Sequence, residues 1–353
     1  MIPYLLLLLF VIFVIILEEN NLDINLRFNN FYLSIIFLIS VIVFFCFYSL
    51  RIDVGYDYPM YSQIINQGTQ EGYISRNEWG SYLLLDFAHE NNSPELFFAL
   101  IAAIAVPLYL FVLKYRNDCK NSLGWGLLLF LAMPIGLLQT LSVSRQFAAV
   151  ACFLYAIKYI KKRKLFNYLL FIIIGMMFHF STILTIPLYW IASERFRYRY
   201  FIYLFIVSYI LIAPVAFFLV RNNFPLYSDY LQITFFDQGG LTQILMYVVL
   251  GIWFVFVKTY WQNNKWYNVY LKIYLYGMFF LITFSPFAGL LGVRLGFAGI
   301  SCALLLFPYT LNVFKHYNGI IVKIIVGVVL MLVYFYSLSL TGEGTYLPYM
   351  TFL

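Results

Sequence analysis

The sequence predicts an all-α integral membrane protein that crosses the bilayer about twelve times. Of its 353 residues, 63% are hydrophobic and only 10% are charged, whereas soluble domains are roughly half apolar and a quarter charged. Apolar runs long enough for a membrane-crossing helix recur from end to end, whereas the strands of an outer-membrane barrel would give short alternating segments. We therefore expect residues 1–353 to form a single polytopic membrane domain.

The predicted spans follow one another along the whole chain. They lie near residues 2–17, 30–50, 94–114, 123–141, 143–160, 165–180, 181–193, 199–220, 241–258, 269–288, 294–311 and 319–340. The first run, PYLLLLLFVIFVIIL, lacks a basic leader and a small-residue cleavage site, so it is predicted to be a span rather than a signal peptide. The segment MMFHFSTILTIP leaves two alternatives, a turn near His179 or one long kinked helix, and we adopt the turn.

The predicted orientation follows from lysine and arginine in the short loops, because short loops rich in these residues lie on the cytoplasmic side. The segment KYIKKRK at 158–164 is the most basic, and RFRYR, KYRNDCK and KTYWQNNKW fall on the same side by parity. Residues 51–93 and 221–240 then form two external loops, and both termini are external. The loop at 18–30 is an exception to this rule, because it is acidic although the orientation places it on the cytoplasmic side.

Part of the first external loop has the spacing of a surface helix. In EWGSYLLLDFA, which begins at Glu78, the apolar positions 79, 83, 84 and 87 recur at helical intervals. This pattern predicts a short amphipathic helix lying on the outer membrane surface.

No motif indicates a cofactor. The four cysteines have no CxxC spacing and form no external pair, so neither a disulfide nor a zinc site is expected. Phosphate-binding loops, dinucleotide fingerprints and nucleophile elbows are also missing from the sequence. The net charge of +7 follows from the basic cytoplasmic loops, so we expect no metal, no cofactor and no nucleic-acid partner.

Three arginines stand at the external ends of well-separated spans: Arg51, Arg145 and Arg294. A guanidinium offers a fixed fork of donors that matches phosphate oxygens, so their convergence would suit a pyrophosphate at headgroup depth. The alternative is that each arginine reaches to lipid headgroups or pairs locally, as Arg51 could with Asp53. Neither Arg145 nor Arg294 has an acidic residue within one helical turn, which favours a functional role.

Three further residues at the same boundary are candidate proton acceptors: Asp57, Glu78 and His179. The alternatives are solvated carboxylates and a hydrogen-bonded structural histidine. Asp57 ranks first because it lies in the most polar external stretch, RIDVGYDYPMY. Tyr58 and Tyr61 follow it about one helical turn apart, where their rings could stack on sugars.

These segments resemble one protein family. RIDVGYDYPMY is similar to the R-x(3)-G-x-D-Y-x-x-Y signature of EpsG-family and related Wzy-type polysaccharide polymerases. EWGSYLL, SRQFAAVACFLYA, FHFSTILTIP, VRLGFAG and the terminal YLPYMTFL resemble later segments of the family, in the same order. Family members often carry Lys or Arg between the histidine and the serine, where this chain has Phe180.

The resemblance implies a GT-C-like membrane glycosyltransferase of the bacterial inner membrane, with its active site on the periplasmic face. Such a polymerase transfers a glycan chain from undecaprenyl pyrophosphate to a new undecaprenyl-pyrophosphate-linked repeat unit, as in O-antigen, capsule or exopolysaccharide synthesis. It uses neither metal nor nucleotide, contacts membrane lipids, and can work with a separate chain-length regulator. Arg51, Arg145 and Arg294 would bind the pyrophosphate.

Two alternatives remain at this point. An O-antigen ligase shares the donor chemistry, and only the order of motifs favours a polymerase. A lipid-linked oligosaccharide flippase or transporter would line its path with ionisable groups and show an inverted repeat, whereas these spans are nearly free of charge. A transmembrane acyltransferase is a more distant possibility.

Overall fold

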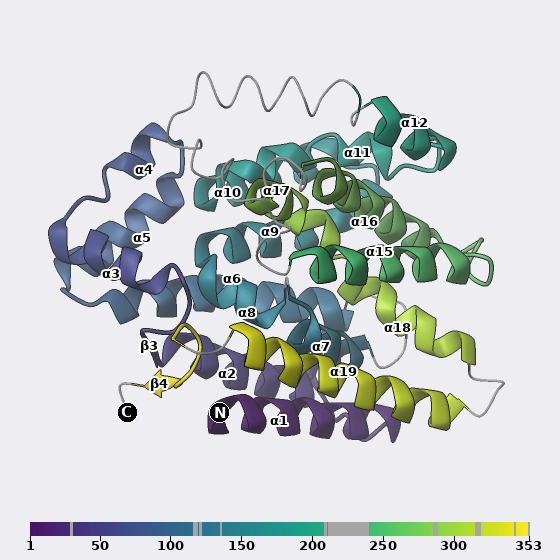
Figure 1. The fold of residues 1–353 in the computed structure, drawn as a ribbon, viewed down its shortest axis with the longest axis horizontal. Helices are drawn as coiled ribbons and strands as arrows, with labels where there is room; N and C mark the ends of the chain where they lie inside the picture. The colour runs from purple at the N-terminus through teal and green to yellow at the C-terminus, as the bar shows by residue number, and fades with distance from the viewer. Residues whose placement is uncertain are drawn as a thin grey trace.

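The computed structural model describes residues 1–28, 31–115, 119, 122–134, 136–207, 210, 240–284, 289–314, 319–341 and 344–351. The described part is mostly helical, and most of its helices run side by side (Figure 1). The helices are α1 (Ile2–Glu19), α2 (Ile35–Ser49), α3 (Tyr58–Gln67), α4 (Gly72–Ser75), α5 (Trp79–Glu90), α6 (Pro94–Tyr115), α7 (Ser122–Ala132), α8 (Leu137–Ser142), α9 (Ser144–Lys161), α10 (Leu165–Phe178), the 3₁₀ helix η1 (Phe180–Thr185), α11 (Leu188–Ile191), α12 (Arg199–Val207), α15 (Gly240–Val257), α16 (Lys265–Phe284), α17 (Gly289–Ile300), α18 (Ala303–Val313) and α19 (Gly319–Thr341).

The α9 helix is the most enclosed part of the bundle. Residues 146–154 are all buried, and the helix packs against α6, α10, α16 and α17. The outer helix α19 differs, because a stripe that includes Ile321, Ile325 and Leu332 is exposed. Such exposed apolar side chains suit contact with lipid rather than water.

Several of the described helices could span a membrane. Three are long and apolar enough: Ile2–Glu19, Pro94–Tyr115 and Gly319–Leu340. A fourth candidate is the pair Gly292–Ile300 and Ala303–Val313, which is bent by 50°. The shorter apolar helices are Ile35–Ser49, Ser122–Ala132, Leu165–Phe178, Phe180–Ile191 and Ile244–Val257. The predicted total of about twelve spans stays a prediction, and most of span 199–220 and nearly all of the loop 221–240 lie outside the described residues.

The turn at His179 is confirmed. The α10 helix ends at Phe178, and His179 has extended backbone angles before η1 begins. The chain then returns along α10, since the Tyr168 hydroxyl donates to the Thr185 carbonyl at 2.6 Å and Arg163 donates to the Tyr189 carbonyl at 3.3 Å. The returning segment is a 3₁₀ turn and a four-residue helix rather than one regular α-helix.

The acidic loop that conflicted with the orientation rule is neutralised by lysines from other helices. Lys114 of α6 lies 2.8 Å from Glu18 and 2.7 Å from Asp23. Lys323 of α19 lies 2.6 Å from Glu19. The end of α1 is therefore fixed to α6 and α19 by ion pairs that are largely shielded from solvent, where such pairs are screened little by salt.

Two short strand pairs add to the helices. The first, β1 (Asn25–Phe28) with β2 (Phe31–Ser34), is an antiparallel pair following α1. The second joins β3 (Arg51–Ile52) to β4 (Met350–Thr351), with Arg51 opposite Thr351. The C-terminal tail thus pairs with the start of the 51–93 loop, and both the N-terminus and β4 lie at the loop's end of the bundle (Figure 1).

The 51–93 loop folds into three helices, α3, α4 and α5. The amphipathic helix predicted from Glu78 onward is present as α5, which buries Ser81, Leu85 and Ala88. Its apolar residues Trp79, Leu83 and Phe87 are exposed instead. A row of exposed apolar side chains of this kind is typical of helices that lie on a membrane surface.

Candidate functional site

Arg145 is held by residues of the 51–93 loop at the first turn of α9. Its Nη1 forms an ion pair with Glu78, and its Nε donates to the Tyr61 hydroxyl at 2.6 Å. The guanidinium carbon lies 4.6 Å from the centroid of the Tyr73 ring. Only 11% of the Arg145 side chain and 5% of the Glu78 side chain are exposed, so the loop covers this charge pair almost completely.

Glu78 also connects the loop to the turn after α10. Its Oε1 accepts the backbone N–H of Phe180 at 2.9 Å. Close by, the Ser81 hydroxyl donates to the Phe178 carbonyl at 2.8 Å. Both Glu78 oxygens are thus already engaged, which makes this carboxylate a positioning group rather than a proton acceptor.

Replacing Glu78 with alanine is therefore expected to destabilise the protein. The change leaves the Arg145 guanidinium buried without its carboxylate, which costs about 3–5 kcal/mol. Thermal unfolding in detergent should show a clearly lower midpoint for Glu78→Ala. The exposed Glu71 is the matched control, and equal midpoints for Glu71→Ala and Glu78→Ala would refute the structural role of the ion pair.

Asp57 lies where the three predicted arginines come together. It precedes α3 at the N-cap position and is half-buried. Burial raises the pKa of the Asp57 carboxyl above its ordinary value, and Arg294, Arg145 and Arg51 oppose this rise. Within the described residues no hydrogen bond occupies its carboxylate oxygens, so the Asp57 side chain has the position and the free lone pairs of a proton acceptor.

Arg294 reaches this group from α17. Its backbone carbonyl accepts a hydrogen bond from Nε2 of Gln146 at 2.6 Å. Because Gln146 follows Arg145 in α9, this bond fixes the two arginine-bearing helices to each other. The interaction links segments that are far apart in the chain, so local spacing gives no sign of it.

Arg51 is placed differently from the other two arginines, because it is only 1% exposed. Its Nη1 donates to the Leu141 carbonyl at 2.6 Å and its Nη2 to the Ser144 hydroxyl at 2.8 Å. The Phe98 ring lies 4.6 Å from the guanidinium carbon. Arg51 therefore fixes the α8–α9 junction, directly before Arg145, rather than lining an accessible surface.

Gly55 permits the close packing of this loop on α8. Its φ of +105° is rarely adopted by other residues, and an added Cβ would lie 2.6 Å from the Leu141 carbonyl oxygen. The neighbouring Tyr56 N–H donates to the Ser142 hydroxyl at 3.0 Å, and that hydroxyl lies 2.6 Å from the hydroxyl of Tyr346. The C-terminal tail thus closes the loop from the other side.

Tyr58 and Tyr61 are both buried against α6. Tyr58 stacks on Phe98 with ring centroids 4.6 Å apart, and Tyr61 lies 4.9 Å from Phe97. The faces that were expected to stack on sugars are therefore largely taken by phenylalanines, and the Tyr61 hydroxyl instead holds Arg145.

His179 lies under the same loop but is oriented by its neighbour. Its Nδ1 lies 2.7 Å from the Ser181 hydroxyl and accepts the Ser181 N–H at 3.3 Å. An accepting Nδ1 carries no proton, so Nε2 is the protonated nitrogen of a neutral ring. In this tautomer His179 can donate a hydrogen bond to a substrate oxygen, but its second nitrogen is not free to take a proton.

The described residues hold no group of three or more His, Cys, Asp or Glu side chains that could bind a metal ion. Tyr73, which flanks Arg145, was not identified from the sequence. The contact between the Tyr73 ring and the Arg145 guanidinium joins residues far apart in the chain, so the spacing of residues around Tyr73 does not indicate it.

The family model described as EpsG matches residues 34–351. This chain belongs to the EpsG family. The match runs from the residue before α2 to the end of β4. It therefore includes Arg51, Asp57, Glu78, Arg145 and Arg294, which we call the arginine cluster.

Membership of the EpsG family confirms the resemblance drawn from the motifs and points to a membrane protein with a polysaccharide polymerase-like role. No match is found among curated proteins or among solved structures.

Proposed function

We propose that this EpsG-family protein is a polysaccharide polymerase. The donor is a glycan chain on undecaprenyl pyrophosphate, and the acceptor is a repeat unit on a second undecaprenyl pyrophosphate. The reaction takes place at the outer face of the bacterial inner membrane, in a protein of about twelve spans.

One observation supports this proposal above the others: three arginines and one half-buried carboxylate gather at the end of the bundle that carries the 51–93 loop. A lipid pyrophosphate needs cationic groups at headgroup depth, and a glycosyl transfer needs a group that accepts the proton of the attacking hydroxyl. The arginine cluster supplies both kinds of group.

In the proposed step, an acceptor hydroxyl oxygen attacks the anomeric carbon of the donor sugar. The bond from that carbon to the pyrophosphate oxygen breaks, and undecaprenyl pyrophosphate leaves with the bonding electrons. Asp57 takes the proton of the hydroxyl. Arg145 and Arg294 stabilise the charge that develops on the leaving group, while Arg51 and Glu78 hold Arg145 in position.

Deletion of the gene tests the proposal in cells. We expect the strain to keep surface or lipid-linked glycan with a single repeat unit and to lose the ladder of longer chains on a gel. A plasmid copy should restore the ladder. A strain that lacks even the single-repeat species would contradict a polymerase and indicate a ligase or a flippase instead.

A further inference from the structure

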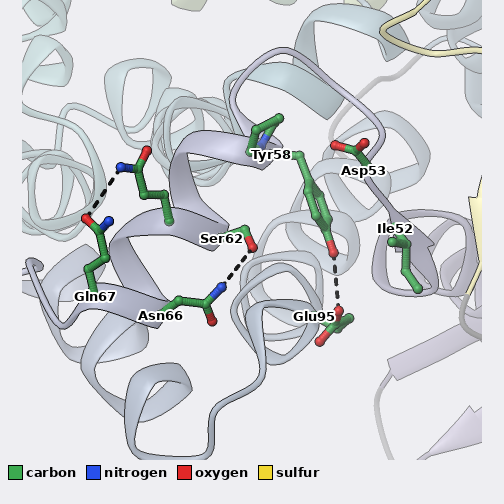
Figure 2. A pocket seen from close by; sticks show the side chains of 9 residues that line it. Ile52, Asp53, Tyr58, Ser62, Asn66, Gln67 and Glu95 are labelled. Carbon is green, nitrogen blue, oxygen red and sulfur yellow. Dashed lines mark hydrogen bonds between the residues drawn. The ribbon is translucent and has the colours of Figure 1, made fainter.

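A cavity of about 570 Å³ lies beside α3, between Ser62 and Asn66 of that helix and Asp53 and Glu95 (Figure 2). The buried face of α3 carries Tyr58, Tyr61 and Ile65. The cavity residues Ser62 and Asn66, one turn apart, lie on the side of α3 next to this face. The volume of the cavity is in the range of small-molecule binding sites.

The α3 side of the cavity is lined by uncharged hydrogen-bonding groups: Ser62, Gln63, Asn66 and Gln67. Nε2 of Gln63 donates a hydrogen bond to Oε1 of Gln67 at 3.4 Å, and Nδ2 of Asn66 donates to the Ser62 hydroxyl at 3.5 Å. Both bonds are long, and the three amides are exposed, so these side chains can turn to a ligand at small cost. Each amide offers a donor and an acceptor side by side, which suits the adjacent hydroxyls of a sugar.

The other side of the cavity carries two carboxylates, Asp53 and Glu95. Glu95 accepts from the Ser93 hydroxyl at 3.0 Å and from the Tyr58 hydroxyl at 3.4 Å (Figure 2). Among the described residues that line the cavity, none is basic. The cavity therefore disfavours phosphate and acidic sugars and differs in charge from the arginine cluster.

The two sites share helix α3. Asp57 precedes α3 and belongs to the arginine cluster, and Tyr58 and Pro59 at the start of α3 line the cavity. A helix with its side chains is about 10–12 Å across, so a glycan whose reacting end meets Asp57 can place later sugar residues in the cavity.

We propose that this cavity binds uncharged sugar residues of the glycan carried by a lipid-linked substrate. This inference rests on the proposed polymerase function and adds a saccharide subsite, formed by the outer face of α3, to the reaction centre. It assigns Gln63 and Asn66 as the residues that recognise sugar hydroxyls.

Binding of a free saccharide tests the subsite without chemistry. The probe is a two-repeat oligosaccharide cut from the host's own polymer, with an unphosphorylated reducing end, titrated calorimetrically into the purified full-length protein. Gln63→Ala/Asn66→Ala should weaken binding about tenfold or more, because each lost hydrogen bond costs about 1 kcal/mol. Excess inorganic pyrophosphate should leave the affinity unchanged.

The matched control is Gln262→Ala/Asn263→Ala, which removes two exposed amides between α15 and α16. No binding to the wild type at millimolar saccharide, equal affinity for both double variants, or competition by pyrophosphate would each overturn the subsite.

The outcomes separate this inference from the proposed function. If chain extension is intact while binding does not depend on Gln63 and Asn66, the subsite fails and the polymerase stands. If the double variant loses saccharide binding but the wild type forms no polymer, the subsite stands and the polymerase fails.

Discussion

Asp57→Asn is expected to reduce chain extension about 10²–10⁴-fold, the range in which general bases contribute. Asparagine keeps the size of the side chain but cannot take the proton of the acceptor hydroxyl. Because the Asp57 carboxylate makes no hydrogen bond among the described residues, the amount of folded protein should not change. The measurement is the initial rate of chain extension at equal amounts of purified protein.

The pH profile provides an independent check on Asp57. A base works when ionised, so activity should fall as pH is lowered through the Asp57 pKa. Burial raises that pKa, and the arginines only partly offset it, so the fall should occur at a higher pH than for a solvent-exposed aspartate. The exposed Glu90 serves as control: Glu90→Gln should keep both rate and profile. An Asp57→Asn variant with the wild-type rate would show that Asp57 is not the base.

Arg145→Ala is expected to lower chain extension about 10²–10³-fold, as the loss of one preorganised donor does in other enzymes. The substitution removes the cation at the start of α9 and leaves Glu78 and the Tyr61 hydroxyl without their shared partner. Arg145→Lys should recover little activity, because one ammonium does not reproduce the planar fork that contacts both groups. The readout is the glycan ladder, together with the amount of monodisperse protein in detergent.

Arg197→Ala is the matched control, since Arg197 is exposed beside α12. It should leave the ladder unchanged. A full ladder in Arg145→Ala at normal protein levels would remove the arginine cluster from the reaction centre.

The sequence predicted the features that depend on local pattern. The helix that begins after Glu78 follows from residue spacing and is present. The turn at His179, one of two alternatives that the sequence leaves open, is present as well. The spacing of Tyr58 and Tyr61 correctly places the two rings on the same side of α3. Phe97 and Phe98 cover that side of α3. They belong to another helix, so the spacing within α3 could not predict this contact.

Contacts between residues far apart in the chain account for the features of the site that the sequence did not predict. Arg145 has no acidic residue within one helical turn, so the sequence predicts a cation without a local partner. Its partner is Glu78, 67 positions away in the chain. Similarly, Arg51 has Asp53 as a neighbour in sequence but bonds to Leu141 and Ser144 instead. Such contacts depend on how the loop folds over the bundle, which composition and spacing do not specify.

The most direct test of the proposed reaction uses purified protein in liposomes with a synthetic undecaprenyl-pyrophosphate-linked repeat unit as the sole substrate. With nucleotides omitted and a metal chelator present, we expect a ladder of products that lengthens with time, and no ladder with Asp57→Asn. If the wild-type protein leaves the single-repeat substrate unextended under these conditions, or extends it equally well after Asp57→Asn, the arginine cluster is not the site of glycan polymerisation.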